Sequence, residues 1–332
     1  MGGGRVWSFL VAAVAAAVIA FPAAAGPRAN GPEGGPVAIF YYPWYSTPVR
    51  DGRWAHWYVD RDGTPALSTA YYPSRGLYSS SNTKIVAAQM REIAMAGVDT
   101  VVVSWWGFDS PEGERLPLVA QSAARQGLSV AIHLEPYRGR TPARAAADIV
   151  RLHEEDGVTD FYVYDADRDP ATDWAEALDP LEGVRVFAHT TLVGRARASG
   201  FDGIYTYDVV TWNGALFRRL CAEAHAVGLM CAPSVGPGYD ARLATRDEAV
   251  RQRFEGATYD RMWKTALRSD ADLVTITSYN EWQEGTQIEP ARAQVGRASY
   301  EGAWRKSGLA AQRAYLAATA GWAARIHERA PQ

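Results

Sequence analysis

The sequence repeats one unit eight times: an apolar, strand-like run followed by a helix-like segment. The first run is Val37–Tyr45 (VAIFYYPWY) and the last is Asp272–Tyr279 (DLVTITSY). Strands that are apolar along their whole length are typical of a parallel sheet covered on both faces. Eight such units in about 290 residues predict an α/β fold, a single (β/α)8 TIM-type barrel with long βα loops that form an active-site cleft.

The alternative fold is a doubly wound open sheet, which requires a glycine-rich phosphate loop after the first strand. The sequence YYPWYSTP at that place is not such a loop. The other strands are expected at Asp99–Gly107, Leu128–Tyr137, Thr159–Asp165, Val184–His189, Asp202–Tyr207 and Leu229–Ser234. The helices are expected at Asn82–Gly97, Gly113–Gln126, Pro142–Glu155, Trp174–Leu181, Leu192–Ala198, Gly214–Val227, Tyr259–Leu267 and Trp304–Ile326.

The N-terminal 25 residues read as a secretory signal peptide, with a positive Arg5, an apolar run over Trp7–Phe21 and small residues at Ala23–Ala25. A secreted or cell-surface protein is therefore expected. An uncleaved anchor in the membrane is the alternative, although the run is shorter than the roughly 20 residues of a membrane span. Residues 26–36 form a Gly/Pro-rich flexible lead-in, and residues 37–328 form the catalytic barrel.

Composition excludes several classes of partner. A net charge of −3 gives no reason to expect nucleic acid, and nothing implies a protein partner. No CxxC, HExxH or EF-hand motif occurs, so we expect no metal and no cofactor. The two cysteines, Cys221 and Cys231, could form a disulfide in an exported protein. Because one falls on an expected helix and the other on the next strand, we expect two buried free thiols.

The eighth strand ends in an unusual stretch, Thr277–Pro290 (TSYNEWQEGTQIEP), which holds Glu281, Glu284 and Glu289. A buried carboxylate is costly unless it has partners or a chemical role. On this stretch alone, a solvated surface turn is an equal alternative. Around the whole ring, however, the strands begin apolar and end in polar or aromatic residues. Active sites of such barrels lie at these C-terminal strand ends, so the pattern favours a site.

Two carboxyl groups suit the hydrolysis of an acetal, in which one acts as an acid and the second acts across the reacting carbon. Glu281 and Glu284 are three residues apart, and a turn would make them neighbours. Glu135, in HLEPY at the end of the third strand, is the third candidate, with an ion pair to Arg138 as its structural alternative. Glu289 is expected to support the others.

Aromatic and polar residues at the strand ends are candidates for sugar binding. His56, His133 and His189 could each bind a hydroxyl group or pack structurally. Trp105 and Trp106 point to opposite faces of a strand, so one of them is expected to stack on a sugar. The predicted substrate contacts are Glu135, Tyr137, His133, Tyr42, Trp105, Trp106, His56, Tyr207 and Asn280.

Five motifs together resemble glycoside hydrolase family 99, which contains endo-acting α-1,2-mannosidases and α-1,2-mannanases. They are FYYPWY, SWWG, HLEPY, PSVGPGYD and NEWQEGTQIEP. The resemblance runs from Val37 to the last helix, and the EWxEGTQIEP pattern is its specific part. It implies a metal-free barrel that cleaves inside α-mannose chains of an oligosaccharide or polysaccharide, with retention of configuration.

The resemblance also implies roles for three glutamates. Glu281 would deprotonate the sugar's own 2-hydroxyl, which attacks the anomeric carbon to give a 1,2-anhydro intermediate. Glu284 would act first as an acid and then as a base, and Glu135 would bind the sugar in the −1 position. The chain departs from the eukaryotic pattern at Gln283, where those members carry His. The tryptophan pair resembles the bacterial pattern and favours mannan over glucosylated N-glycans.

Two alternatives remain open. Related barrel families with an NEWxEG-like strand end act on other polysaccharides, and the TQIEP continuation favours family 99. A non-catalytic carbohydrate-binding barrel would be expected if a catalytic carboxylate were missing, but Glu281 and Glu284 are both present.

Overall fold

The computed structural model describes, apart from Met1, residues 37–245 and 247–329. The expected signal peptide (1–25) and lead-in (26–36) lie outside the described residues and stay predictions. Within the described part, no helix is long and apolar enough to cross a membrane.

One parallel sheet forms the centre of the fold, in the order β10-β9-β8-β7-β6-β5-β1-β14-β11. The segments β10 and β11 belong to a single strand that Pro233 interrupts, because proline has no N–H to donate. Since β10 pairs with β9 and β11 pairs with β14, this strand closes the ring of eight. The predicted (β/α)8 barrel is therefore confirmed. The strands are β1 (Val37–Tyr41), β5 (Thr100–Trp105), β6 (Ser129–Leu134), β7 (Asp160–Val163), β8 (Arg185–His189), β9 (Gly203–Tyr205), β10 (Met230–Ala232), β11 (Ser234–Val235) and β14 (Val274–Ile276).

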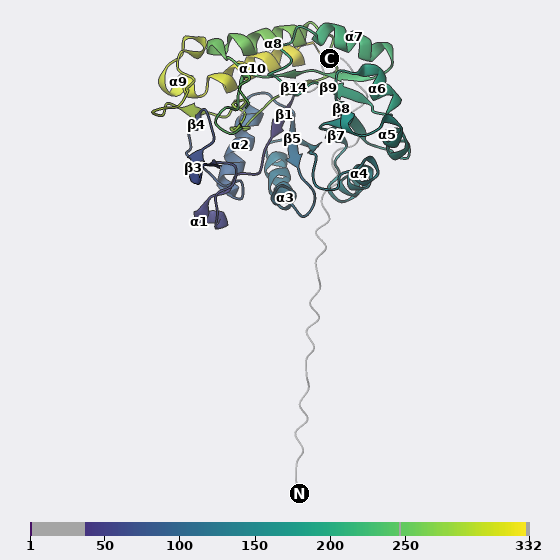
Figure 1. The fold of residues 1–332 in the computed structure, drawn as a ribbon, viewed down its shortest axis with the longest axis horizontal. Coiled ribbons are helices and arrows are strands. Elements are labelled where there is room, and N and C mark those ends of the chain that lie inside the picture. The colour runs from purple at the N-terminus through teal and green to yellow at the C-terminus, as the bar shows by residue number, and fades with distance from the viewer. Residues whose placement is uncertain (2–36, 246, 330–332) are drawn as a thin grey trace. The chain divides into compact units, whose positions relative to one another are not determined.

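Helices surround these strands (Figure 1). Several begin at a side-chain cap: Asn82, Ser110 and Thr141 each accept a hydrogen bond from the first turn of their helix. The expected single helix Trp304–Ile326 is wrong. Trp304 has a positive φ of 48° inside a 3-10 turn and Ser307 is extended, so two helices follow instead of one. The helices are α2 (Thr83–Met95), α3 (Pro111–Ala124), α4 (Pro142–Asp156), α5 (Ala171–Leu178), α6 (Val193–Ala198), α7 (Phe217–Ala226), α8 (Ala257–Leu267), α9 (Gly308–Gln312) and α10 (Ala314–His327).

Two apolar layers hold the barrel together. The larger layer lies between the outer face of the sheet and the helices. The smaller layer fills the inside of the ring and is rich in aromatic rings, including Phe40, Tyr162, Phe187 and Tyr205. Because side chains alternate along a strand, this packed floor excludes water beneath the polar residues at the C-terminal strand ends.

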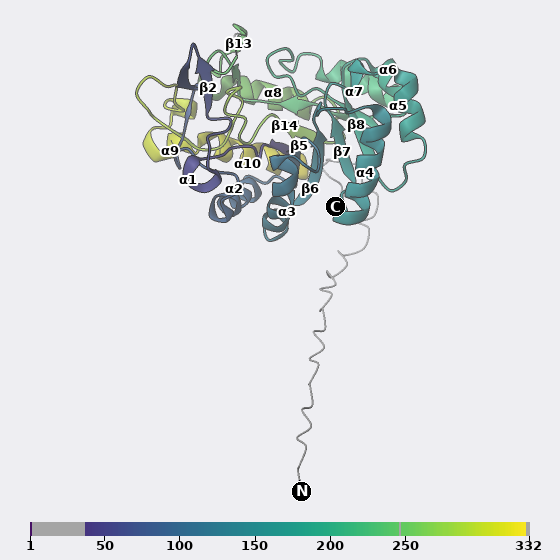
Figure 2. The same cartoon turned by 60° about the horizontal axis from the view of Figure 1, so that its bottom comes forward.

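The loops that follow the C-terminal ends of the strands contain two hairpins. The segment Ser46–Ser81, between β1 and α2, contains the short helix α1 (Pro48–Asp51) and the hairpin β2–β3 (Tyr58–Arg61 and Thr64–Leu67). A second hairpin consists of β12 (Tyr239–Asp240) and β13 (Val250–Arg251). The two hairpins lie side by side (Figure 2), and Arg61 donates a 2.8 Å hydrogen bond to the carbonyl of Arg242. A third short pair joins β4 (Tyr72–Pro73) to β15 (Ala291–Arg292).

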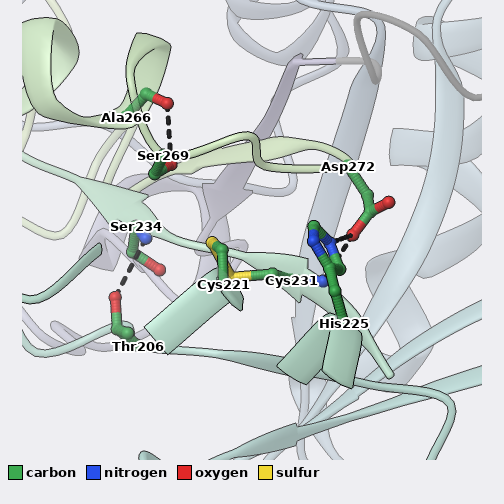
Figure 3. The surroundings of a disulfide bond; sticks show 8 residues. All are labelled: Thr206, Cys221, His225, Cys231, Ser234, Ala266, Ser269 and Asp272. Atoms are coloured by element: carbon green, nitrogen blue, oxygen red, sulfur yellow. Dashed lines mark hydrogen bonds and ion pairs between the residues drawn. A yellow bond between two sulfur atoms is a disulfide. The ribbon is translucent and has the colours of Figure 1, made fainter. Parts of the chain in front are cut away.

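Cys221 and Cys231 form a disulfide (Figure 3), so the expectation of two free thiols was wrong. Helix α7 folds back onto β10, and this places the inward face of the helix over the strand, with 5.1 Å between the two Cα atoms. Beside the bridge, Asp272 accepts a 2.7 Å hydrogen bond from the backbone N–H of Cys231 and lies 2.8 Å from Nε2 of His225.

Candidate active site

The loop after β14 folds back on itself and carries two of the predicted carboxyl groups. The N–H of Ser278 donates to the carbonyl of Thr286 (3.1 Å), and the Ser278 hydroxyl accepts from the N–H of Glu281 (2.8 Å). A turn spans residues 282–285, closed by a 3.3 Å bond from the N–H of Gly285 to the carbonyl of Trp282. The predicted turn between Glu281 and Glu284 is therefore confirmed.

The end of β1 clamps this loop from one side. The Tyr45 hydroxyl donates to the carbonyl of Asn280 (2.9 Å) and accepts from the N–H of Trp282 (3.0 Å). The Asn280 carboxamide accepts from the N–H of Tyr42 (2.7 Å) and donates to its carbonyl (2.9 Å). Asn280 is fully buried and its side chain is occupied by the backbone of Tyr42. Its predicted sugar contact is therefore wrong, and it joins β1 to the loop instead.

The β12–β13 hairpin supports the loop from behind. The N–H of Asp240 donates a 2.7 Å bond to the carbonyl of Glu284. The next residue, Gly285, has φ +63°, and a Cβ there would lie 3.1 Å from the backbone N and O of Asp240. A glycine is required both for the left-handed backbone and for this close approach.

Glu135 lies at the end of β6 with two partners. The Ser104 hydroxyl donates to its carboxylate at 2.7 Å, and Nδ1 of His133 lies 3.1 Å from it. The alternative ion pair with Arg138 is therefore wrong. His133 is 1% exposed, and its Nε2 is 2.8 Å from the Tyr205 hydroxyl. Within the described residues, Nδ1 of His133 makes no hydrogen bond despite its short distance to Glu135. The predicted contact of His133 with a sugar stays a prediction.

The carboxyl groups form one electrostatic cluster. Burial raises the pKa of Glu284 to about 8, and the nearby charges of Asp208 and Glu135 add to this effect. Burial, with the charges of Glu284 and Glu135, raises the pKa of Glu281 well above its usual range. The structure thus brings together the three glutamates that the sequence singled out. Like charges in a buried space disfavour full ionisation, so the cluster holds on to protons at neutral pH.

Two phenols stand beside the carboxyl cluster. The hydroxyl groups of Tyr42 and Tyr207 share a hydrogen bond. Burial, together with the charges of Glu135 and Glu281, raises the pKa of Tyr42 well above its usual range. Tyr207 has a positive φ of 39°, a conformation that costs free energy for a residue with a side chain and that is concentrated at functional sites. Their predicted roles in substrate binding stay predictions.

Asp208 is a site residue that the sequence predictions missed. It follows Tyr207 at the end of the sixth strand, and Nε2 of His189 lies 3.1 Å from its carboxylate. The His189 ring stacks on Tyr164 with 4.6 Å between ring centroids. The only signal in the sequence was the position of Asp208 at a strand end, which many loop residues share.

His56 and Gln283 connect the catalytic loop to the segment before α2. The His56 ring stacks on Trp44 at 4.3 Å, and its Nδ1 is 3.4 Å from Oε1 of Gln283. The Gln283 amide donates to the Ser68 hydroxyl at 3.0 Å. Burial lowers the pKa of His56 to about 4, so this ring is neutral at pH 7. His56 is half-buried, and its contact with a sugar stays a prediction.

Trp105 and Trp106 differ in how deeply they are buried. Trp105 faces the helices, fully buried against Phe108 and Tyr137. The Tyr137 hydroxyl donates to Asp148 of α4. The predicted sugar contacts of Trp105 and Tyr137 are therefore wrong, because both rings belong to the outer core. Trp106 is half-buried, and its stacking role stays a prediction.

Glu289 has a different environment from the other glutamates of its motif. It is fully buried and accepts hydrogen bonds from Tyr78 (2.7 Å), Gln89 (2.9 Å) and the Trp282 indole (2.8 Å), with Nε of Arg75 at 3.1 Å. These contacts anchor the loop to α2, in agreement with the expected supporting role. Among the described residues, no group of three or more His, Cys, Asp or Glu side chains could hold a metal ion.

The chain is similar to known proteins over almost its whole length. The model of glycosyl hydrolase family 99 matches residues 35–328. A glycoprotein endo-alpha-1,2-mannosidase-like protein from Danio rerio is 30% identical over 318 residues, covering 77% of this chain and 71% of the relative. A glycoprotein endo-alpha-1,2-mannosidase from Mus musculus is 29% identical over 314 residues, covering 76% and 67%. The solved structure of the GH99 endo-alpha-mannosidase from Bacteroides thetaiotaomicron superposes with a TM-score of 0.78 at 27% identity, covering 88% of this chain and 98% of that one.

Proposed function

This chain belongs to glycosyl hydrolase family 99, and from that premise we propose that it cleaves internal α-mannosidic linkages of α-1,2-mannan or mannose-rich N-glycans with retention. The relatives whose names include endo-alpha-1,2-mannosidase support this activity. The observation that carries the proposal is the pair of carboxyl groups of Glu281, which is buried, and Glu284, which is half-buried, beside Glu135 at the C-terminal end of the barrel.

In the first step, the Glu281 carboxylate takes the proton of the 2-hydroxyl of the sugar in the −1 position. The 2-oxygen then forms a bond to the anomeric carbon while the glycosidic bond breaks. The departing oxygen takes the proton of Glu284, and a 1,2-anhydro sugar remains. A base close to the 2-hydroxyl gains interaction energy as positive charge develops at the ring, which lowers the barrier.

In the second step, the Glu284 carboxylate takes a proton from water, and the water oxygen attacks the anomeric carbon. The bond from the anomeric carbon to the 2-oxygen breaks, and that oxygen recovers its proton from Glu281. Two inversions at one carbon give net retention. Each glutamate ends in the protonation state in which it began.

The raised pKa of Glu284 suits its role as the acid, whereas Glu281, whose pKa burial also raises, must be ionised to act as the base. Glu281 and Glu284 carry one proton between them at the start, in the intermediate and at the end. A buried pair whose charges repel favours such a singly protonated state over a doubly ionised one. A pKa of about 8 also keeps Glu284 protonated at neutral pH, as a general acid requires. Glu135, which accepts a hydrogen bond from Ser104, binds hydroxyl groups of the −1 sugar in this proposal.

The anomeric outcome tests the mechanism. We would follow the purified protein by NMR with an α-1,2-linked manno-oligosaccharide that carries a reducing-end extension. The proposal expects cleavage of an internal bond with the α-anomer appearing first. If the β-anomer appears first, the reaction inverts and participation of the 2-hydroxyl is wrong. If only another α-glycan is cut, the alternative of a hydrolase for a different polysaccharide replaces the mannosidase.

Export belongs to the same proposal. The N-terminal pattern of a signal peptide and the Cys221–Cys231 disulfide both suit an oxidising compartment outside the cytoplasm. Mass spectrometry of the protein from cells and medium tests it. A mature N-terminus at Gly26 supports secretion, and an intact N-terminus in the membrane fraction supports the anchor instead.

A further inference from the structure

Arg253 is a buried cation without an acidic partner. It lies between β13 and the 3-10 turn Phe254–Gly256 and is 7% exposed. Among the described residues, no carboxylate forms a salt bridge with it, and its Nε and Nη1 atoms have no hydrogen-bond acceptor. A buried guanidinium normally requires a carboxylate, so this arrangement needs another source of stabilisation.

Three tyrosine rings supply it. The guanidinium carbon lies 4.6 Å from the ring centroid of Tyr71, 4.9 Å from that of Tyr300 and 4.6 Å from that of Tyr315. Aromatic faces attract a cation, and the attraction is strongest where water is excluded. The backbone also makes room, because a Cβ at Gly238 would lie 2.7 Å from Cγ of Arg253. These three rings form a tyrosine cage that holds the guanidinium in one place.

The one hydrogen-bonded nitrogen of Arg253 points at the catalytic loop. Its Nη2 donates to the carbonyl of Gly285 (2.8 Å) and to that of Gln287 (2.7 Å). Gly285 directly follows Glu284. Thr286 lies between the two acceptors, and its carbonyl accepts the hydrogen bond from the N–H of Ser278 that closes the loop. The Tyr300 hydroxyl adds a 2.9 Å bond to the carbonyl of Gln287.

We infer that Arg253 is a positioning residue for Glu284, which fixes the backbone on the C-terminal side of this acid through two charge-assisted hydrogen bonds. A carboxylate partner would compete for the same donors and would add a further negative charge near the carboxyl cluster. The tyrosine cage holds the cation without either effect. The inference rests on the proposed function for its kinetic consequence, because Glu284 is the acid of that reaction.

The test compares Arg253→Met and Arg253→Lys with the wild-type protein. Displacement of a catalytic group by about 1 Å can lower the rate about 100-fold, so we expect Arg253→Met to lower kcat by about 10- to 100-fold with KM little changed. Arg253→Lys keeps the charge and one donor group and should recover part of the loss. Arg185→Met is the control for general destabilisation, since Arg185 binds Asp160 at the opposite end of the barrel.

A second measurement does not depend on activity. The pKa of Glu284 is followed by NMR titration of carboxyl-labelled protein, with Glu284→Gln used to assign the signal. Displacement of the loop toward water should lower this pKa in Arg253→Met, partly restore it in Arg253→Lys, and leave it unchanged in Arg185→Met.

The possible outcomes separate the two proposals. If Arg253→Met loses stability as Arg185→Met does, while kcat and the pKa of Glu284 stay as in the wild type, Arg253 is only structural and the inference is overturned. If the wild type cleaves no α-mannoside but Arg253→Met still lowers the pKa of Glu284, the positioning role stands and the proposed function fails.

Discussion

Replacing Glu284 with glutamine should stabilise the protein, and the gain should grow with pH. The folded state raises the pKa of Glu284 from 4.5 to about 8, mainly through burial. The folded state therefore binds more protons than the unfolded state between these values, and stability falls as the pH rises through this window. Glutamine has almost the same shape but no charge, so Glu284→Gln removes this loss.

The expected size follows from the two pKa values. A difference of one pH unit is worth about 1.4 kcal/mol, so the full effect above pH 8 is about 5 kcal/mol. At pH 7 about 3 kcal/mol should be present, and at pH 5 less than about 1 kcal/mol. For a chain of this size, 3 kcal/mol corresponds to a rise in Tm of roughly 4–5 °C.

Thermal unfolding followed by circular dichroism at pH 5, 7 and 9 measures this effect. Glu154→Gln is the matched control, because Glu154 lies on the exposed face of α4, and it should change Tm little at any of the three pH values. Glu284→Gln should at the same time abolish turnover. A Tm difference that is constant across the pH range, or that matches the control, would refute the claim that burial raises this pKa.

Three further predictions test other parts of the structure. Asp208→Asn removes the largest nearby charge acting on Glu284, so the basic limb of the pH profile of kcat should move to lower pH; an unmoved limb would contradict this. Replacing both Cys221 and Cys231 with alanine should lower the free energy of unfolding by about 2–3 kcal/mol, measured by denaturant titration, because the unfolded chain loses a constraint. Asn280→Ala leaves the buried backbone groups of Tyr42 without partners and should cost about 2–4 kcal/mol in the same assay.

The barrel was predictable because its signals are local. Each apolar run and each helix stop can be read within about 15 residues, and each of the eight strands overlaps its expected range, although several end up to four residues earlier than expected. The disulfide was not predictable in this way. Its formation depends on which face of α7 meets β10, and that is set by packing between elements rather than by the spacing of Cys221 and Cys231.

The direction of the side chains explains why some predicted substrate contacts were wrong. Trp105 and Trp106 are adjacent and chemically alike, and only the strand register decides that Trp105 faces the helices. Tyr137 also packs in the apolar layer between the sheet and the helices. Asp208 and Arg253 were missed for the opposite reason, since they reach the site from loops that are far from Glu284 in the sequence.

The three glutamates of NEWQEGTQIEP show which physical quantity separates a structural carboxylate from a chemical one. Burial raises the pKa of Glu289 too, but the hydrogen bonds that it accepts and the nearby Arg75 oppose this increase. Burial and neighbouring carboxylates raise the pKa values of Glu281 and Glu284. No hydrogen-bond donor or cation is among the groups that shift these two pKa values. Sequence gives the same residue type three times within nine positions. Only the count of donors around each carboxyl group identifies Glu281 and Glu284 as groups that keep their capacity to exchange protons with a substrate.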